Sequence, residues 1–203
     1  MGFFTHLLDI LLPRTDTKRI VDELTLEKLG SLVAPSITPS GVTTLLPYRH
    51  PFVRAVIREA KFHRNEKALT LLAYVLDDYI SSLMEDTSSY EEKEFICIPI
   101  PLGPNRLKQR GYNQVELVME KTYVAVDATL LIRTKDTLPQ TSLSRAKRLK
   151  NVAGAFTVTG TPKPDSTYIL IDDVTTTGTT ILEAGKVLNH AGIKNCILLS
   201  LAH

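Results

Sequence analysis

Residues 169 to 180 read Ile-Leu-Ile-Asp-Asp-Val-Thr-Thr-Thr-Gly-Thr-Thr. Three apolar residues typical of a buried strand lead into two carboxylates, and a turn rich in threonine precedes an apolar pattern of helical period from Ile181. This order predicts an anion site, because backbone N–H groups at a helix start point outward and favour a phosphate. Gly178 permits a turn that a Cβ would hinder, and the carboxylates can accept hydrogen bonds from sugar hydroxyls.

Length and composition are those of a globular protein. The 203 residues suffice for one sizeable domain, and the net charge of +2 gives no overall drive toward nucleic acid. Cys97 and Cys196 each lie in an apolar run, which indicates buried thiols in a reducing compartment. We therefore expect a cytoplasmic protein without structural zinc. No segment is long and apolar enough to span a bilayer, so we expect no membrane span.

The second half of the chain alternates strand and helix patterns. Apolar runs near residues 95–98, 129–132, 156–158 and 196–199 predict further strands, and Asn113 with Glu116 is typical of a helix start. This alternation predicts an α/β fold with a parallel β-sheet flanked by helices.

The same patterns predict how the chain is divided. We expect residues 91–203 to form the α/β core as one compact unit and residues 1–90 to form a helical N-terminal hood, irregular over residues 14–47. We expect a glycine- and base-rich loop over residues 101–112.

The common phosphate motifs do not match this chain. It has neither Gly-x4-Gly-Lys-Ser/Thr nor Gly-x-Gly-x-x-Gly after a strand, which argues against an ATPase P-loop and a dinucleotide site. Residues 169–180 instead resemble the phosphoribosyl pyrophosphate signature of the type I phosphoribosyltransferases. Ile98-Pro99-Ile100-Pro101-Leu102 and Arg110-Gly111-Tyr112-Asn113-Gln114 narrow this resemblance to the ComF family.

Further positions extend the resemblance over roughly residues 47 to 203. They are Lys61, Arg106, Gln140, Arg145, Asn151-Val152 and Gly154-Ala155-Phe156. The N-terminus departs from the family, because Leu11-Leu12-Pro13 is present but the usual zinc-binding cysteines are not. What replaces that zinc module, and whether its partner contacts persist, stays open.

The resemblance implies a site for phosphoribosyl pyrophosphate or a nucleotide, together with Mg²⁺. Asp172 and Asp173 would bind the ribose hydroxyls and hold Mg²⁺, mainly through water and the ligand, and Arg106 and Arg110 would neutralise the leaving pyrophosphate. The same four residues are the candidate catalytic residues. The remaining ligand-binding candidates are Pro101, Leu102 and Gly103 for pyrophosphate and Val174, Thr175, Thr176, Thr177, Gly178 and Thr179 for the 5′-phosphate.

Several functions stay open at this point. The leading hypothesis is transfer of phosphoribose to a base or amine, with an acceptor that the sequence does not identify. The alternative is a non-catalytic competence adaptor that binds single-stranded DNA and DNA-processing proteins, and a ligand sensor without turnover is a third. The basic segment with Gln140, Arg145, Lys147 and Arg148 is a lid, a nucleic-acid contact or simply an exposed helix face. A homodimer is also compatible with the sequence.

Overall fold

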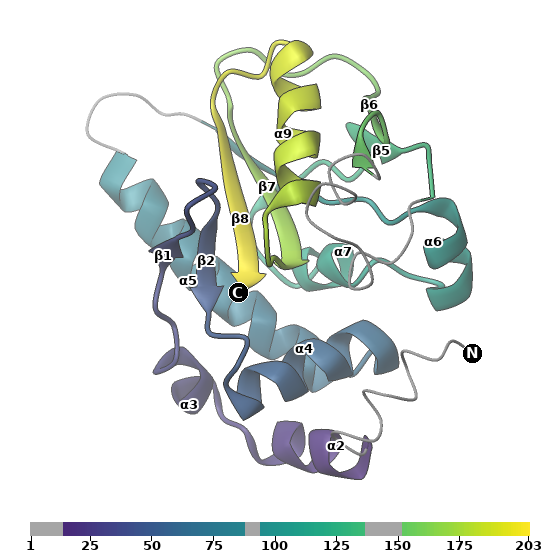
Figure 1. The fold of residues 1–203 in the computed structure, drawn as a ribbon. Coiled ribbons are helices and arrows are strands. Elements are labelled where there is room, and N and C mark those ends of the chain that lie inside the picture. Colours follow the sequence, from purple (N-terminus) through teal and green to yellow (C-terminus); the bar gives the residue numbers. More distant parts are fainter. Residues whose placement is uncertain (1–13, 88–93, 137–151) are drawn as a thin grey trace.

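The computed structural model describes residues 14–87, 94–136 and 152–203, with a six-stranded sheet at its centre (Figure 1). The strands lie in the order β1-β2-β8-β7-β3-β4, and all neighbours are parallel except β1 and β2. Their bounds are β1 Ser36–Ile37, β2 Thr43–Leu46, β3 Phe95–Pro99, β4 Ala125–Val126, β7 Thr167–Val174 and β8 Cys196–Ala202. The predicted α/β fold with a parallel sheet is confirmed.

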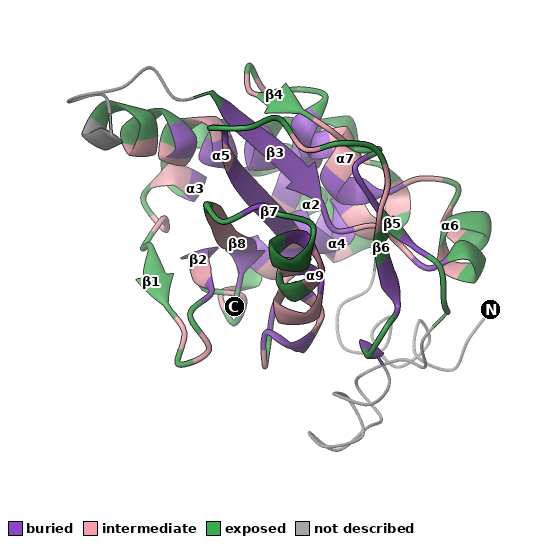
Figure 2. Ribbon diagram, turned by 90° about the horizontal axis from the view of Figure 1, so that it is seen from above, coloured by how far each residue is buried: buried purple, intermediate pink, exposed green. Residues whose placement is uncertain are grey.

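Helices cover both faces of this sheet. One apolar cluster joins it to the N-terminal helices and to α7, and a second joins it to α9 and to a separate pair of antiparallel strands, β5 and β6. The elements are α2 Arg14–Glu23, α3 Leu26–Gly30, α4 Pro51–His63, α5 Glu66–Thr87, α6 Pro104–Arg110, α7 Gln114–Met119, α9 Thr179–His190, β5 Leu131–Arg133 and β6 Phe156–Val158. Figure 2 shows the middle strands buried and the edge strands β1 and β4 exposed.

Strand β7 is apolar on both faces because both faces are covered. Ile169 and Ile171 belong to the cluster beneath α4, α5 and α7, whereas Tyr168 and Leu170 belong to the cluster beneath α9. Successive side chains of a strand alternate between faces. The alternation places Asp173 on the side of α4 and α7, and Asp172 on the opposite side.

Some local predictions differ from the structure. The segment 101–112 contains the short helix α6, which begins at Pro104 and ends before Gly111 in the left-handed region (φ +81°). Proline at the first turn and glycine after the last are both favourable for a helix, so the prediction of a loop over the whole segment is wrong. The helix from Asn113 was confirmed, although it stops at Met119 and leaves Tyr123 99% exposed.

The sheet takes up residues from both sides of the boundary expected near residue 90. Strand β2, from the segment expected to be an irregular cap, pairs with β8 in parallel, and Thr43 lies opposite Leu199. The division into a hood and a core stays a prediction. Gln140, Arg145, Lys147 and Arg148 lie outside the described residues. Within those residues no helix is long and apolar enough to cross a membrane.

Candidate functional site

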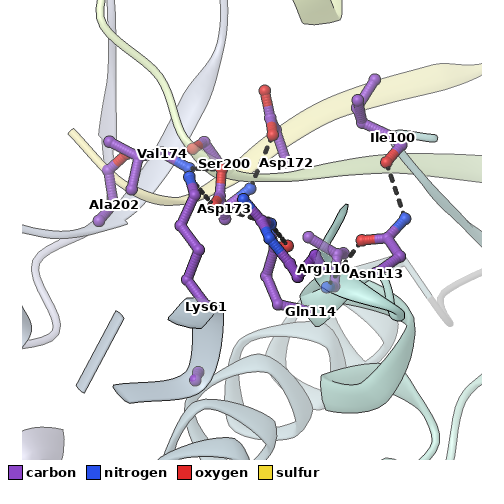
Figure 3. Close-up of polar contacts among 12 residues, drawn as sticks. Lys61, Ile100, Arg110, Asn113, Gln114, Asp172, Asp173, Val174, Ser200 and Ala202 are labelled. Carbon is purple, nitrogen blue, oxygen red and sulfur yellow. Dashed lines mark hydrogen bonds and ion pairs between the residues drawn. The ribbon is translucent and has the colours of Figure 1, made fainter. Parts of the chain in front are cut away.

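The acid pair lies at the C-terminal end of β7, where its two members have different surroundings (Figure 3). Asp173 is buried: its Oδ1 accepts a hydrogen bond from the Val174 N–H at 2.8 Å. Its Oδ2 accepts hydrogen bonds from Lys61 Nζ at 2.5 Å and from Gln114 Nε2 at 2.6 Å. Asp172 is only half-buried, and its Oδ1 accepts the Asp173 N–H at 2.9 Å. Both oxygens of Asp173 are therefore engaged, whereas Asp172 faces away from Lys61.

These surroundings move the two pKa values apart. Burial and the neighbouring charge of Asp173 raise the pKa of Asp172 to about 7. Burial also acts to raise the pKa of Asp173, but that pKa is lowered overall by the charge and hydrogen bond of Lys61, the Val174 N–H and the charge of Arg110. Asp173 is thus the ionised partner near neutral pH, and Asp172 changes its charge there.

Two separate elements bring donors to Asp173. Lys61 comes from the last turn of α4, and Gln114 is the first residue of α7. Asn113 caps α7 by accepting the Val115 N–H at 3.0 Å, which confirms the predicted helix start. Its Nδ2 also donates to Glu116 Oε1 at 2.9 Å. Arg110 donates to the Oε1 of Gln114, so this arginine extends the chain of contacts behind Asp173.

The threonine turn has the geometry of an anion site. Gly178 has φ +72°, a conformation that glycine adopts without strain, and α9 begins directly after it. The Thr175 N–H is taken by Ala202, whereas the first N–H groups of a helix such as α9 have no partner within the helix. The hydroxyls of Thr177 and Thr179 lie 2.8 Å apart. The predicted 5′-phosphate residues therefore form one contiguous turn at a helix N-terminus.

The segment that follows β3 lies beside the acid pair. Ile100 donates its N–H to Ile171 at 2.8 Å, which places Pro101 and Leu102 next to the end of β7. The predicted pyrophosphate loop and the predicted ribose site thus share one end of the sheet, as α/β ligand sites do. A carboxylate of the chain already lies there, because Asp136 Oδ1 accepts the Asn105 N–H at 3.0 Å.

Sequence reasoning missed Arg133 at the end of β5. It is buried, and burial, followed by the charge of Arg106, lowers its pKa, while the charges of Asp172 and Asp136 act to raise it. Arg133 and Arg106 therefore bring two positive charges toward the Asp172 side of the sheet. The only sequence signal was an arginine after the apolar run 130–132, which is typical of many strand ends.

A hollow of about 500 Å³ is lined in part by the threonine turn. Its lining comes from β7 and the turn after it, from the end of β8 and from the segment that enters α4. These residues are Pro47, Tyr48, Arg49, Val174, Thr175, Thr176 and His203. The aromatic, cationic and apolar groups suit a planar heterocycle with polar substituents.

The donor set for a metal ion is small. Among residues 14–87, 94–136 and 152–203, no group of three or more His, Cys, Asp and Glu side chains is placed to hold a metal. A Mg²⁺ ion held mainly by water and by ligand oxygens needs fewer protein ligands. Asp172 fits that arrangement because its side chain is partly accessible, whereas both oxygens of Asp173 are already hydrogen-bonded.

Comparison with known proteins finds competence proteins and DNA utilization proteins among the relatives of this chain. The chain is 34% identical over 123 residues to the competence protein ComFC of Streptococcus pneumoniae, covering 61% of this chain and 54% of that protein. It is 34% identical to competence protein F of Haemophilus influenzae, over 52% of this chain and 48% of that protein. The DNA utilization protein YhgH of Salmonella typhimurium is 27% identical over 70% of this chain and 63% of its own length.

The chain thus spans about half the length of the two competence proteins it matches. No protein-family model matches it. A hypoxanthine phosphoribosyltransferase from Staphylococcus aureus aligns in structure over 66% of this chain and 62% of that chain, with 14% identity and a TM-score of 0.37. The sequence relatives confirm the resemblance that the motifs predicted: the chain is similar to the competence proteins of the ComF type.

Proposed function

We propose that this protein binds phosphoribosyl pyrophosphate together with Mg²⁺ at the C-terminal end of β7. One observation carries the proposal: the unbroken acid-acid-threonine-glycine signature lies where a strand ends and a twelve-residue helix begins, with a left-handed glycine between them. The turn at residues 175–179 would bind the 5′-phosphate, and Asp172 would accept hydrogen bonds from the ribose hydroxyls.

The surrounding charges support a bond-breaking role for this site. When the bond from the anomeric carbon to pyrophosphate breaks, negative charge accumulates on the leaving group, and positive groups placed there lower the barrier. Arg106 and Arg133 are the cations of the described chain that we assign to this task, beside the loop at residues 101–103. Bound Mg²⁺ would add charge neutralisation on the pyrophosphate oxygens.

The acceptor would be a base or an amine bound in the hollow beside Thr176. Tyr48 offers a ring for stacking, and Arg49 and His203 offer donors for ring oxygens or nitrogens. This hollow adjoins the proposed 5′-phosphate turn. Transfer would also require that the acceptor reach the anomeric carbon of the bound phosphoribose. Whether the protein turns the ligand over or only binds it is a separate question that a pyrophosphate-release assay with common bases answers.

Calorimetry tests the binding proposal directly. We expect heat on adding phosphoribosyl pyrophosphate with Mg²⁺ to the wild type, and a loss of affinity of at least about tenfold in Asp172→Asn, on the order of one charge-assisted hydrogen bond. Asp78→Asn is the matched control, because Asp78 lies exposed on α5 and outside the site. Absence of heat in the wild type, or equal affinity in Asp172→Asn, contradicts the proposal.

The relatives favour a second function, an adaptor in DNA uptake. They are named competence proteins and DNA utilization proteins. We propose single-stranded DNA as the ligand of the basic segment with Arg145, Lys147 and Arg148. Fluorescence anisotropy with labelled oligonucleotides at two salt concentrations should show salt-sensitive binding that Arg145→Glu and Arg148→Glu weaken. The control Arg19→Glu should leave it unchanged, because Arg19 is an exposed residue of α2. Equal binding in all variants rejects this role.

A further inference from the structure

The hydroxyl of Tyr112 lies at the C-terminal end of helix α4. It accepts a hydrogen bond from the Arg64 N–H at 3.0 Å, and its oxygen lies 3.2 Å from the Ala60 carbonyl and 3.1 Å from the Lys61 carbonyl. The single hydroxyl hydrogen can serve either carbonyl. Tyr112 therefore contacts both sides of the helix end, the last carbonyls and the first N–H group beyond it.

This contact acts as a helix cap that another part of the chain supplies. The last carbonyls of a helix have no partner within it. Arg64, the residue directly after α4, lies in the left-handed region (φ +46°), a conformation disfavoured for a residue with a Cβ. The guanidinium of Arg64 also lies over the Tyr112 ring, 6.0 Å from its centre. Tyr112 thus helps to fix the last turn of α4, the turn that carries Lys61.

The same tyrosine lies two residues before Gln114, the other donor to Asp173. Lys61 and Gln114 donate to the same oxygen atom, Asp173 Oδ2. They belong to two helices, α4 and α7, that are far apart in the sequence. Tyr112 joins these elements directly, since its backbone belongs to the turn between α6 and α7 and its hydroxyl binds α4. Arg110, four residues before Gln114, extends the contact on the same side through Gln114.

We propose that Tyr112 is a positioning residue that holds Lys61 and Gln114 together on Asp173. Through them it fixes the end of β7, and its effect on ligand binding rests on the proposed phosphoribosyl pyrophosphate site. Tyr112 itself acts from the side of the sheet covered by α4 and α7, and it reaches Asp173 through Lys61. General packing of a half-buried ring predicts a different result, because ring packing survives the loss of the hydroxyl alone.

The first experiment needs no ligand. In ¹⁵N-lysine-labelled protein, an ammonium held by a buried carboxylate exchanges slowly enough with water to give an N–H signal, which Lys61→Arg identifies by its absence. We expect this signal in the wild type and its loss in Tyr112→Phe. Tyr123→Phe is the matched control, because Tyr123 is 99% exposed. No Lys61 signal in the wild type, or its persistence in Tyr112→Phe, overturns the proposal.

The second experiment is a double-mutant cycle on the affinity for phosphoribosyl pyrophosphate with Mg²⁺. Tyr112→Phe and Lys61→Met should each weaken binding by about three- to tenfold, on the order of one hydrogen bond. In the double variant the loss should be smaller than the sum of the two single losses. Fully additive losses show that Tyr112 does not act through Lys61 and overturn the proposal. If the wild type binds no phosphoribosyl pyrophosphate, the proposed function fails, and the lysine signal still decides the role of Tyr112.

Discussion

The ammonium of Lys61 lies 2.5 Å from Oδ2 of Asp173, although the two residues are 112 positions apart in the sequence. Asp172, the neighbour of Asp173, takes no part in this contact because strand alternation places it on the opposite side of β7. The two carboxylates of the signature therefore have different tasks. Asp173 is hydrogen-bonded to α4 and α7, and Asp172 is the carboxylate to which we assign the ligand contact.

Removal of Lys61 should destabilise the protein. Lys61→Met leaves the buried Asp173 carboxylate without its cation, and the side chain of Lys61 is itself only 27% exposed. We expect the free energy of unfolding in urea to fall by about 2 kcal/mol. Lys18→Met is the matched control: it removes an ion pair with Asp22 whose side chains are 58% and 49% exposed, and a change within about 0.5 kcal/mol is expected. Similar losses in both variants would show that Asp173 does not depend on Lys61.

The free energy of unfolding should depend on pH through the titration of Asp172. Its folded pKa of about 7 lies above the ordinary value of 3.8, so between these pH values the folded state keeps a proton that the unfolded chain releases. Stability therefore falls as pH rises through this window. Asp172→Asn removes the contribution, so its free energy of unfolding relative to wild type should increase from pH 4 to pH 7. Urea unfolding across that range measures it; a difference independent of pH would contradict the raised pKa.

Ligand affinity should follow the same titration with the opposite sign. Only the ionised Asp172 accepts two sugar hydroxyls fully and attracts Mg²⁺, so wild-type affinity for phosphoribosyl pyrophosphate should rise as pH increases through about 7. Asp172→Asn lacks this carboxylate, so the pH dependence of its affinity shows the titration of the ligand itself. The ratio of the two affinities, measured by calorimetry from pH 6 to 8, should grow with pH, and a constant ratio would exclude Asp172 as the titrating group.

A side chain at position 178 should destabilise the protein and weaken phosphate binding. An alanine there would strain the backbone at φ +72° and bring its Cβ to 2.7 Å from Ser40 Oγ. We expect Gly178→Ala to cost about 1–2 kcal/mol of stability and to reduce phosphate binding. Gly41→Ala is the control, because Gly41 has φ +82° but nothing within 4 Å of an added Cβ, so it reports the backbone strain alone. Equal effects of both changes on ligand affinity would contradict a specific role of the turn.

Asp136 should compete with the pyrophosphate. Its carboxylate accepts the Asn105 N–H at 3.0 Å beside Gly103, in the loop that the proposed ligand needs. We expect Asp136→Asn to bind inorganic pyrophosphate with Mg²⁺ more tightly, by about threefold or more, because a negative charge is removed from the loop. A weaker affinity would assign Asp136 to holding the loop in its binding conformation instead.

The sequence predicted the local order of the site well. The apolar run 169–171 predicted a buried strand, and the threonines with Gly178 before an apolar helical pattern predicted a turn, which agrees with β7 and the start of α9. Asn113 with Glu116 likewise marked a helix start correctly, because capping depends on residues close in the chain.

Long-range contacts were less accessible from the sequence. The pairing of β2 with β8 joins short apolar segments whose periodicity is weak, and nothing in residues 43–46 indicates a partner near residue 200. The burial of Arg133 depends on the packing of β5 against β6. Strand alternation alone, in contrast, predicts that the side chains of Asp172 and Asp173 lie on opposite faces of the sheet. The ligand contacts expected of both acids stay a prediction.

The most direct test follows the backbone amides of the protein by NMR as phosphoribosyl pyrophosphate and Mg²⁺ are added. We expect the largest changes in chemical shift at residues 175–180, with further changes at 102–106 and at Asp172. Ribose 5-phosphate alone should change the shifts of the first group. If the amides of 175–180 stay in place while the ligand is in excess, the turn after the acid pair is not a phosphoribosyl site.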